Sequence, residues 1–462
     1  MIPVIALIGR PNVGKSTLFN ALTRTRDAIV ADIPGLTRDR QYGIGKVGHK
    51  KFIVVDTGGL SGQQQDLDDL MARQTLLALK EADIILFMVD ARSGINSGDE
   101  VIASMVRKAG KQTTVVLNKI DGVNPDHAEG DFYALGFPDM ALVAASQRRG
   151  INSLIEQVMQ DYPDEVESDE EPEGPSIAII GRPNVGKSTL INRLVGEERV
   201  VAFDQPGTTR DSIPVPFERH GKNYTLIDTA GVRRRGKVHE TIEKFSVIKT
   251  LDAIEKANVV VVVVDARDGI TDQDLTLLGY VLNSGRSLVL AINKWDGLEP
   301  EQREYNKTEL HRRLSFVDFA NQHFISALHG TGVGDLMKSI DQAYASAFRQ
   351  FNTRELTDLL EEAVFKHNTP IHNSRRAKLR YAHQGGKNPP IIIIHGSKTD
   401  SLPESYKRYL MSFYIKKLKL MGTPIRVEFK VGENPFAGKR NKLTKHQVGK
   451  KQRMMKFVKK KK

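Results

Sequence analysis

The chain of 462 residues contains no cysteine. This absence excludes disulfide bonds, thiolate metal sites and a cysteine nucleophile. Long hydrophobic runs are also missing, since no window approaches the roughly 20 apolar residues that a membrane helix requires. The longest apolar run, 259–264, is typical of a buried strand, and the apolar start leads directly into a glycine-rich loop, unlike a signal peptide. We therefore expect a soluble cytoplasmic protein without a membrane partner.

Acidic residues are scarce in the C-terminal quarter. Residues 347–462 hold 28 Lys and Arg against 8 Asp and Glu, which gives this part a net charge of +20. Because the whole chain carries +12, the residues before it sum to −8. A charge this asymmetric predicts a polyanionic partner for the C-terminal part.

The sequence GRPNVGKST occurs twice, at 9–17 and at 181–189. Each copy follows an apolar run and opens a segment of helical periodicity, the strand, loop and helix order that a phosphate-binding loop needs. Gly9 and Gly14 allow the backbone N–H groups to approach an anion, and the following helix adds its positive dipole end. Lys15 is expected to reach the outer phosphates, and the Ser16 hydroxyl suits magnesium.

Two identical copies of nine residues make a chance match untenable. The loop residues expected to contact nucleotide are Gly9, Arg10, Pro11, Asn12, Val13, Gly14, Lys15 and Ser16, and Gly181, Arg182, Pro183, Asn184, Val185, Gly186, Lys187 and Ser188. In the second copy, Lys187 is expected to reach the outer phosphates and Ser188 to bind magnesium.

Further magnesium and phosphate ligands follow each loop. Thr37 lies in a polar segment that reads as a loop, and Asp56 ends a predicted strand. Both suit a magnesium site, while a backbone N–H at Gly59 can meet the γ-phosphate, which makes the loop a sensor of that group. The full predicted set is Asp56, Thr57, Gly58, Gly59 and Leu60 in the first copy, and Thr209, Asp228, Thr229, Ala230, Gly231 and Val232 in the second, with Thr209 and Asp228 on the metal.

A second motif identifies the base. The strand at 113–117 runs into Asn118-Lys119-Ile120-Asp121, and the second copy has Asn293-Lys294-Trp295-Asp296. A carboxylate here can accept hydrogen bonds from N1–H and the 2-amino group of guanine, a pair that adenine lacks, so GTP and GDP are the expected ligands. Ser326 and Ala327 are expected to contact the base of the second copy. Ala145 aligns with Ala327 but the serine is lost, so the first copy's base contact is expected to be looser.

The spacings indicate a duplicated domain. Gly9 and Gly181, like Asp56 and Asp228, lie 172 residues apart. The predicted organisation is a first α/β domain at 1–162, an acidic linker at 163–175, a second α/β domain at 176–346, a C-terminal α+β domain at 347–432 and a basic tail at 433–462. The linker holds seven acidic residues, no basic ones and three prolines, as expected for a solvated tether.

These motifs closely resemble those of the Der (EngA) family of tandem-domain GTPases within the Era-like branch. The resemblance covers essentially the whole chain. It implies two P-loop GTPase domains, each with a mixed six-stranded sheet flanked by helices, followed by a KH-like domain. It also implies a role in maturation of the large ribosomal subunit.

Two departures from other small GTPases bear on hydrolysis. Leu60 and Val232 stand where many such enzymes place a glutamine that orients the attacking water, so unassisted hydrolysis is expected to be slow. In related Era-like enzymes an asparagine at the position of Asn12 and Asn184 binds potassium, which stabilises charge between the phosphates; the alternative is that it only hydrogen-bonds the turn. The expected catalytic residues are Lys15, Asn12, Thr37, Gly59, Lys187, Asn184, Thr209 and Gly231, with Mg²⁺ and K⁺ as cofactors.

A basic run, 233–237, follows the second copy's DTAG, where the first copy has no such charge. It is either a solvated surface or a nucleotide-dependent phosphate contact, and we favour the contact because the two copies differ. This difference suggests unequal roles for the two switches.

The C-terminal part is expected to contain helices at 353–365 and 405–420 and strands at 378–383, 391–395 and 425–430. Gly385-Gly386-Lys387-Asn388 is expected between strands and does not supply the GxxG loop of ordinary KH modules. The tail from 432 has twelve basic residues and one acidic. Ribosomal RNA, bound through its phosphates, is favoured over a membrane surface as its partner.

The leading hypothesis is a monomeric, GTP-driven switch that binds rRNA of the large subunit and is released by hydrolysis. One alternative is a GTPase subunit of an RNA-modification complex, although no modification chemistry is visible. Another is a nucleotide-independent RNA chaperone, which would leave two intact nucleotide sites without a purpose.

Overall fold

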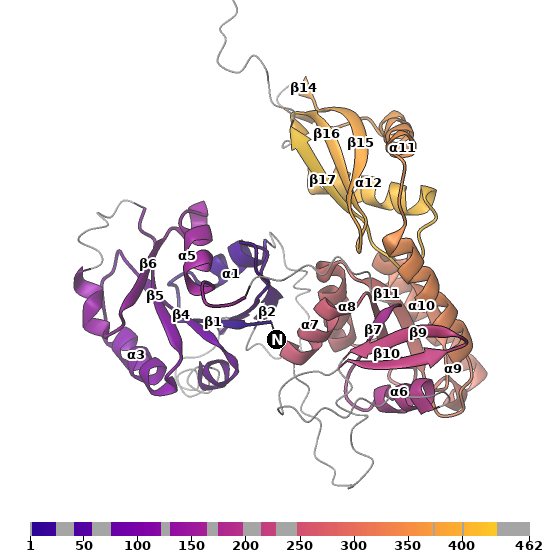
Figure 1. The fold of residues 1–462 in the computed structure, drawn as a ribbon, viewed down its shortest axis with the longest axis horizontal. Coiled ribbons are helices and arrows are strands. Elements are labelled where there is room, and N and C mark those ends of the chain that lie inside the picture. Colours follow the sequence, from indigo (N-terminus) through magenta and orange to yellow (C-terminus); the bar gives the residue numbers. More distant parts are fainter. Residues whose placement is uncertain are drawn as a thin grey trace, which may run out of the picture. The chain divides into compact units, whose positions relative to one another are not determined.

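The computed structural model describes residues 2–24, 41–57, 75–121, 130–163, 174–196, 214–227, 247–372, 375–399 and 402–431. These residues separate into two compact units (Figure 1). The first comprises Met1–Gln350, Gly386–Pro390 and Ile415–Arg426, and the second Phe351–Gly385, Ile391–Tyr414 and Val427–Lys462. Two six-stranded sheets belong to the first unit and a three-stranded sheet forms the centre of the second. The thirteen residues of the predicted acidic linker and the basic tail lie almost entirely outside the described ranges.

The first sheet has the strand order β2-β3-β1-β4-β5-β6. Only β2 is antiparallel to its neighbour, so the sheet is mixed. Its elements are β1 (Val4–Ile8), α1 (Lys15–Thr23), β2 (Gln41–Ile44), β3 (Ile53–Asp56), β4 (Ile84–Asp90), α3 (Ser97–Ala109), β5 (Gln112–Asn118), β6 (Asp139–Val143) and α5 (Ile151–Val158), with 3-10 turns at Tyr133–Leu135 and Ala145–Gln147.

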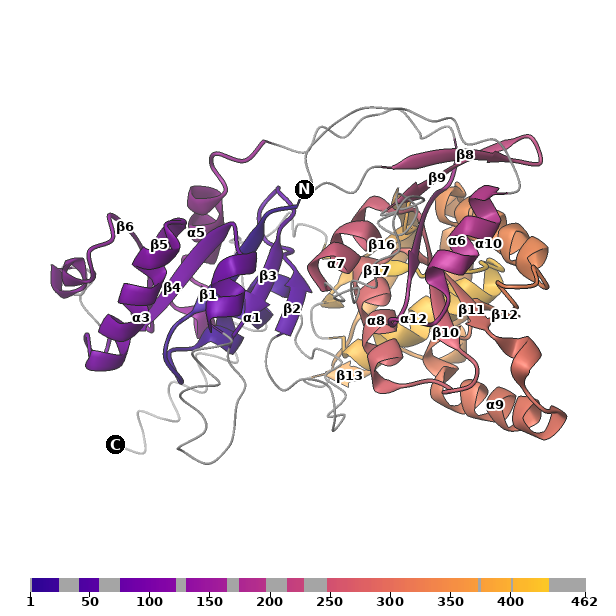
Figure 2. The same ribbon diagram turned by 90° about the horizontal axis from the view of Figure 1, so that it is seen from below.

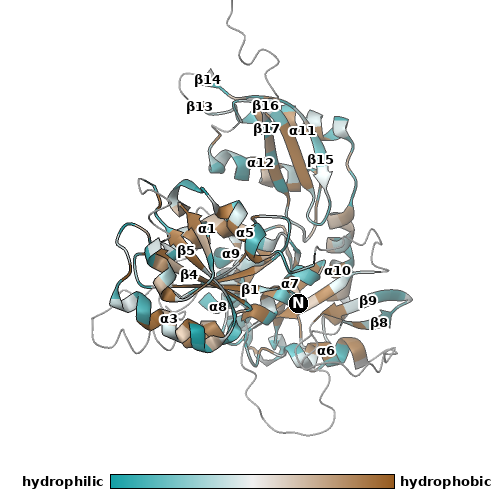
Figure 3. Cartoon of the chain, turned by 60° about the vertical axis from the view of Figure 1, so that its left-hand side comes forward, coloured by the Kyte–Doolittle hydropathy of each residue, from teal (hydrophilic) through white to brown (hydrophobic). Residues whose placement is uncertain are grey.

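Alternation along β1 explains why helices cover both faces of this sheet. Ile5 and Leu7 pack into a core that includes α1 and α5, whereas Val4, Ala6 and Ile8 pack into a core that includes α3. Successive side chains of a strand point to opposite faces, so a strand that is apolar throughout is buried on both sides. Figure 3 shows these strands as hydrophobic.

The second sheet repeats the arrangement, with the order β8-β9-β7-β10-β11-β12. Ile177 and Ile179 of β7 pack with α6 and α10, and Ala178 and Ile180 pack with α7 and α8. Figure 2 shows the helices of these two pairs on opposite sides of the sheet. The elements are β7 (Ser176–Ile180), α6 (Lys187–Gly196), β8 (Val215–Arg219), β9 (Lys222–Ile227), α7 (Val247–Lys256), β10 (Val259–Asp265), α8 (Asp272–Ser284), β11 (Ser287–Asn293), α9 (Pro300–Arg313), β12 (Asn321–Phe324) and α10 (Val333–Phe348), with 3-10 turns at Trp295–Gly297 and Ser315–Val317.

The strand order places the phosphate loops at a topological switch point. From β1 the chain passes to β3 on one side, and then returns to β4 on the other. In open α/β sheets a ligand crevice forms at such a point, outside the carboxyl ends of the strands. The loops after β1 and β7 therefore occupy the position where this architecture binds ligands. The predicted fold of two P-loop domains with mixed six-stranded sheets is confirmed.

The C-terminal sheet has the order β15-β16-β17, with helices α11 and α12 beside it (Figure 1). The two helices contact one another, because the hydroxyl of Tyr414 donates to the carbonyl of Leu356 at 2.9 Å. The elements are α11 (Thr353–Lys366), β13 (Ile371–His372), β14 (Arg375–Arg376), β15 (Lys378–Gly386), β16 (Ile391–Ser397), α12 (Glu404–Lys417) and β17 (Arg426–Val431).

This order of elements agrees with the predicted KH-like topology, with two differences. The small β13-β14 hairpin was not predicted, and β15 extends to Gly386, so the first two residues of the expected connecting loop are strand. A Cβ at Gly385 would collide with Ile393 on the neighbouring strand, which explains a glycine inside a strand here. None of the helices in the described ranges combines the length and apolar character needed to cross a bilayer.

Candidate functional site

The two phosphate loops have the same backbone geometry. Gly14 immediately precedes α1 and has φ 99°, and Gly186 precedes α6 with φ 98°. This left-handed conformation strains residues that carry a Cβ, and a Cβ at either position would also collide with an asparagine Nδ2, of Asn118 or Asn293 respectively. The glycine is therefore needed both for the turn and for the close approach of a second loop.

The loop lysines fold back onto their own loop. The Nζ of Lys15 donates to the carbonyl of Gly9 at 2.7 Å and to that of Arg10 at 2.8 Å, and Lys187 donates to Arg182 at 2.7 Å. Burial lowers the pKa of Lys15, an effect that the nearby Asp56 carboxylate partly offsets. A buried ammonium whose partners are neutral carbonyls is well placed to gain from an anion in the loop.

Ser16 and Asp56 lie side by side at the mouth of the first loop. The Ser16 hydroxyl donates to Asp56 Oδ2 at 2.8 Å, and Asp56 is fully buried at the end of β3. Thr57 turns inward, since its hydroxyl donates to the Leu7 carbonyl at 2.9 Å. A hydroxyl and a carboxylate oxygen in contact form the hard oxygen donor set that Mg²⁺ prefers.

The asparagine that begins the second motif braces three loops together in each domain. In the first domain Asn118 Nδ2 donates to the carbonyl of Val13 at 2.8 Å, and its Oδ1 accepts from the N–H of Ala145 at 3.0 Å. In the second, Asn293 makes the same two bonds with Val185 at 2.8 Å and Ala327 at 2.9 Å. Each asparagine thus joins the phosphate loop to the predicted base-contact loop.

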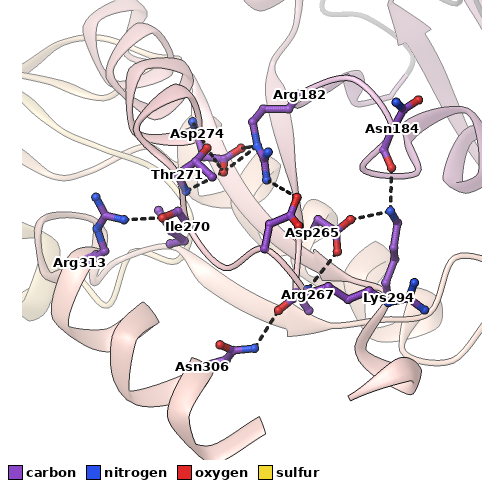
Figure 4. Close-up of polar contacts among 12 residues, drawn as sticks. Arg182, Asn184, Asp265, Arg267, Ile270, Thr271, Asp274, Lys294, Asn306 and Arg313 are labelled. Atoms are coloured by element: carbon purple, nitrogen blue, oxygen red, sulfur yellow. Dashed lines mark hydrogen bonds and ion pairs between the residues drawn. The ribbon is translucent and has the colours of Figure 1, made fainter. Parts of the chain in front are cut away.

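The lysines of the second motif also contact the phosphate loops. Lys119 Nζ donates to the carbonyl of Asn12 at 2.7 Å, and Lys294 Nζ donates to that of Asn184 at 2.8 Å (Figure 4). Both asparagines adopt the left-handed conformation, with φ 65° and 62°. Their side chains are exposed. An asparagine tolerates this conformation better than most residues, which gives it a local reason to occupy the position.

Two aspartates that the motif analysis missed hold these lysines. Lys119 Nζ lies 2.7 Å from Asp90 Oδ2, and Lys294 Nζ lies 2.5 Å from Asp265 Oδ2. Burial raises the pKa of Asp90, but the hydrogen bonds from Lys119 and from the N–H of Arg92 outweigh it, so the pKa is lowered overall. The sequence held a signal, because VDAR ends the preceding strand in both copies at 89–92 and 264–267, offset by 175 residues like the asparagines.

A buried carboxylate anchors each loop arginine. Arg182 Nε lies 3.0 and 3.1 Å from the two carboxylate oxygens of Asp274, which is fully buried (Figure 4). Arg10 Nε is 3.3 Å from Asp99 Oδ1 in the first domain. Asp99 and Asp274 also complete capping boxes at the starts of α3 and α8, so the phosphate loop is joined to the next helix. Sequence analysis did not single out these aspartates.

Each predicted base-reading motif begins with the bracing asparagine and ends with an aspartate. The carboxylates of these aspartates, Asp121 and Asp296, have different partners. Asp121 forms an ion pair with Arg92, whereas the Oδ2 of Asp296 lies 3.6 Å from the Nε2 of His329. The hydrogen bond from Ser326 is the main cause that lowers the pKa of Asp296. The third residues of the motifs are packing residues: Ile120 joins a hydrophobic core, and Trp295 lies 4.2 Å, between ring centroids, from Phe324.

Part of the predicted site lies outside the described residues. The predicted residues that lie outside the described ranges are Thr37, Gly58, Gly59, Leu60, Thr209, Asp228, Thr229, Ala230, Gly231, Val232 and the basic run 233–237. The predicted residues that are described gather at the carboxyl ends of β1, β3 and β5 in the first sheet and of β7 and β11 in the second.

Comparisons with known proteins match these features. The family described as 50S ribosome-binding GTPase matches residues 4–119 and 176–294, and the C-terminal KH-domain-like family of EngA bacterial GTPase enzymes matches 350–430. The chain is 60% identical to the GTPase Der of Thioalkalivibrio sulfidiphilus over 100% of both chains. It is 58% identical to the GTPase Der of Hahella chejuensis, over 100% of this chain and 98% of the relative. A solved structure of Era with MgGDPNP and nucleotides of 16S ribosomal RNA has 21% identity and a TM-score of 0.30, covering 56% of this chain and 93% of Era, a likeness too distant to carry a functional argument.

Proposed function

This chain belongs to the GTPase Der family and is a GTPase, and on that premise we propose that it is a nucleotide-controlled switch for assembly of the large ribosomal subunit. The observation that carries the proposal is the pair of phosphate loops, each braced through an asparagine to its own base-contact loop. Two such loops in one chain with a basic C-terminal part fit a factor that couples GTP to binding of RNA.

We assign phosphate binding to the two loops. Lys15 and Lys187 leave the loop carbonyls that they now contact and bind the outer phosphates, because phosphate oxygens are charged and stronger acceptors. The N–H groups at the starts of α1 and α6 bind the same anion. Gly59 and Gly231 are assigned to the γ-phosphate, and Asp121 and Asp296 to the guanine edge, which excludes adenine.

Magnesium fits the first loop because Ser16 and Asp56 bring two oxygen donors into contact. In our proposal Ser16, Thr37 and Asp56 hold the ion in the first domain, and Ser188, Thr209 and Asp228 in the second. When bound, the ion would neutralise charge on the phosphate oxygens. The residues of this chain hold and orient the nucleotide.

Potassium is proposed as a second ion, at Asn12 and Asn184. The backbone carbonyls of these asparagines are held by Lys119 and Lys294, while their side chains are exposed at the loop surface. This leaves an amide oxygen on each loop where a monovalent cation could replace the charge of an arginine finger. Because Leu60 and Val232 cannot orient water, we expect hydrolysis to depend on such a charge.

The switch itself is proposed to act on the ribosome. GTP orders the loops that follow each phosphate loop, this arrangement presents the C-terminal domain and tail to rRNA of the immature large subunit, and hydrolysis releases the protein. The matching family is that of the 50S ribosome-binding GTPases, which supports the choice of subunit. We propose that the protein acts in the cytoplasm as a monomer.

Co-sedimentation tests this function. The full chain is centrifuged with large and small subunits in the presence of GTP, a non-hydrolysable GTP analogue or GDP. We expect binding to the large subunit that is strongest with the analogue and is lost in Lys15→Ala or Lys187→Ala chains. Equal binding in all nucleotide states would support a nucleotide-independent RNA chaperone instead, and binding to the small subunit alone would contradict the choice of partner.

A further inference from the structure

The carboxylate that is expected to read guanine is oriented by a serine in the second domain. Ser326 is 3% exposed, its hydroxyl lowers the pKa of Asp296 by acting as a hydrogen-bond donor, and its oxygen accepts from the N–H of His329 at 3.3 Å. An antiparallel bridge between Ser326 and Thr331 closes the loop that carries it. The hydroxyl is therefore fixed by its surroundings and can fix the carboxylate in turn.

The first domain has no such hydroxyl. Ala145 and Ala327 each donate a backbone N–H to the bracing asparagine of their domain, at 3.0 and 2.9 Å, which aligns the two loops residue by residue. The bridge between Ala144 and Arg149 then corresponds to the bridge that Ser326 makes. Ala144 consequently stands where the serine would be, and its methyl group cannot donate to Asp121.

In the first domain, an arginine just beyond the end of β4 holds Asp121 instead. Arg92 follows β4 and donates its Nε to the carbonyl of Lys119 at 3.2 Å and its Nη2 to the carbonyl of Asp121 at 2.9 Å. The same Nη2 forms the ion pair with the Asp121 carboxylate. The planar guanidinium therefore spans the motif, fixing its backbone and its acidic side chain at once.

The corresponding arginine of the second domain is placed differently. Arg267, which lies 175 residues after Arg92, packs against Gly297, where an added Cβ would come within 3.1 Å of its Nε. Its backbone N–H donates to the Asp265 carboxylate at 3.0 Å, and within the described residues its guanidinium forms no hydrogen bond or ion pair with Asp296. The side-chain groups that lower the pKa of Asp296 are first the Ser326 hydroxyl, then the His329 ring and the charge of Arg267.

We propose that Arg92 is the positioning residue that sets the guanine-reading carboxylate of the first domain, in place of the serine used by the second. The inference rests on the proposed function, because it takes Asp121 as the residue that reads guanine. A carboxylate has about four acceptor positions, so Arg92 can remain bound while both oxygens accept from the base. The arginine orients Asp121 and does not touch the nucleotide.

The replacement has a physical consequence. The Arg92 side chain is 51% exposed and that of Asp121 is 29% exposed, so their attraction is screened by salt. The Ser326 hydroxyl is buried and carries no charge, although the Asp296 carboxylate is itself 39% exposed, so screening by salt acts less on this interaction than on an ion pair. Guanine recognition by the first domain should therefore weaken more steeply with ionic strength than recognition by the second.

The test uses full-length chains in which one site is disabled. Lys187→Ala leaves the first site and Lys15→Ala leaves the second, and GDP and IDP are titrated calorimetrically, because IDP lacks the 2-amino group. Adding Arg92→Ala to the Lys187→Ala chain should weaken GDP binding about tenfold and reduce the GDP preference over IDP. Arg92→Lys keeps the charge but loses the fork and should give an intermediate preference.

A transplanted hydroxyl supplies the decisive control. Adding Ala144→Ser to the Arg92→Ala chain should restore GDP binding and its preference over IDP, while Ser326→Ala in the Lys15→Ala chain should cause the same loss as Arg92→Ala. Arg267→Ala is the matched variant and should change the preference little. Thermal denaturation checks folding, which truncation of an exposed side chain should not disturb.

Either an unchanged or an increased GDP preference in Arg92→Ala would overturn the inference, since the arginine would then be neutral or a competitor of the base. Asp121→Ala separates this failure from failure of the proposed function. If that variant keeps its guanine preference, the assignment of Asp121 is wrong; if it loses the preference and Arg92→Ala does not, only the role of Arg92 is wrong.

Discussion

Replacing Asn293 by alanine should break the link between two halves of the second nucleotide site. The side chain is 3% exposed and joins the carbonyl of Val185 to the N–H of Ala327, two residues that are themselves 1% exposed. Removing it leaves a buried acceptor and a buried donor without partners. Each such group costs about 1–3 kcal/mol, so the expected loss of unfolding free energy is about 2–6 kcal/mol.

This loss is large against the total stability of about 5–15 kcal/mol that a domain usually has. It should be accompanied by weaker binding of GDP at the second site, because the phosphate loop and the base-contact loop are no longer held in register. Chemical denaturation measures the first effect, and calorimetric titration in a Lys15→Ala chain measures the second. Asn118→Ala should behave in the same way at the first site.

Asn321→Ala is the matched control. Asn321 also donates a side-chain hydrogen bond, to Ser339 at 2.8 Å, but it begins β12, away from the phosphate loop. Ser339 keeps a second partner, His323, at 2.8 Å, so no group is orphaned and the cost should be only about 0.5–1.5 kcal/mol. If Asn293→Ala costs no more than this control and leaves GDP affinity unchanged, the bracing role is refuted.

Three further outcomes follow. Turnover should be faster in KCl than in matched NaCl, and Asn184→Ala in a Lys15→Ala chain should remove the difference; equal rates in the two salts before mutation would eliminate potassium from the account. Gly186→Ala should reduce bound GDP from about two per chain to about one, since φ 98° and the nearby Asn293 exclude a Cβ, and full occupancy would contradict this. Burial, followed by the nearby Tyr409, raises the pKa of Tyr406 to about 12. The folded state then keeps a proton that the unfolded state loses above about pH 10, so stability should fall from about pH 10 to 12, and Tyr406→Phe should flatten that fall in urea unfolding; an unchanged slope would show that Tyr406 is not the group responsible.

The sequence predicted individual strands and the phosphate loops because local patterns carry that information, whereas the two six-stranded sheets were implied by the family resemblance. The apolar strands, the glycines before each helix and the repeated spacing are all visible within short stretches. The bounds of the C-terminal elements were less accurate. The second predicted helix ends at Lys417 instead of 420. Strand β15 continues through Gly385 and Gly386, and the reason for a glycine at 385 is its close approach to Ile393, which lies on the neighbouring strand β16.

Side-chain partners that lie far apart in the sequence could not be predicted. Arg182 and Asp274 are 92 residues apart, and Arg92 and Asp121, which follow the neighbouring strands β4 and β5, are 29 apart. The loss of the serine in the first domain was visible in the alignment of the copies, but its replacement was not. Only the packing of β4 beside β5 shows that Arg92 reaches the motif.

The two nucleotide sites therefore share a frame and differ in detail. Phosphate loops, bracing asparagines and the lysine-aspartate pairs are repeated, whereas the partners of Asp121 and Asp296 are not. Such differences allow two sites of common origin to respond to different nucleotide concentrations or salt conditions.

Calorimetric titration of the full chain with GTP analogue, GDP and their adenosine counterparts tests the central claim most directly. Two sites should take up guanosine nucleotides, with unequal affinities, and one site should remain in each of Lys15→Ala and Lys187→Ala, while adenosine nucleotides should bind far more weakly. Binding of adenosine nucleotides as tight as that of guanosine nucleotides, or a single guanosine site in the unaltered chain, would contradict the account.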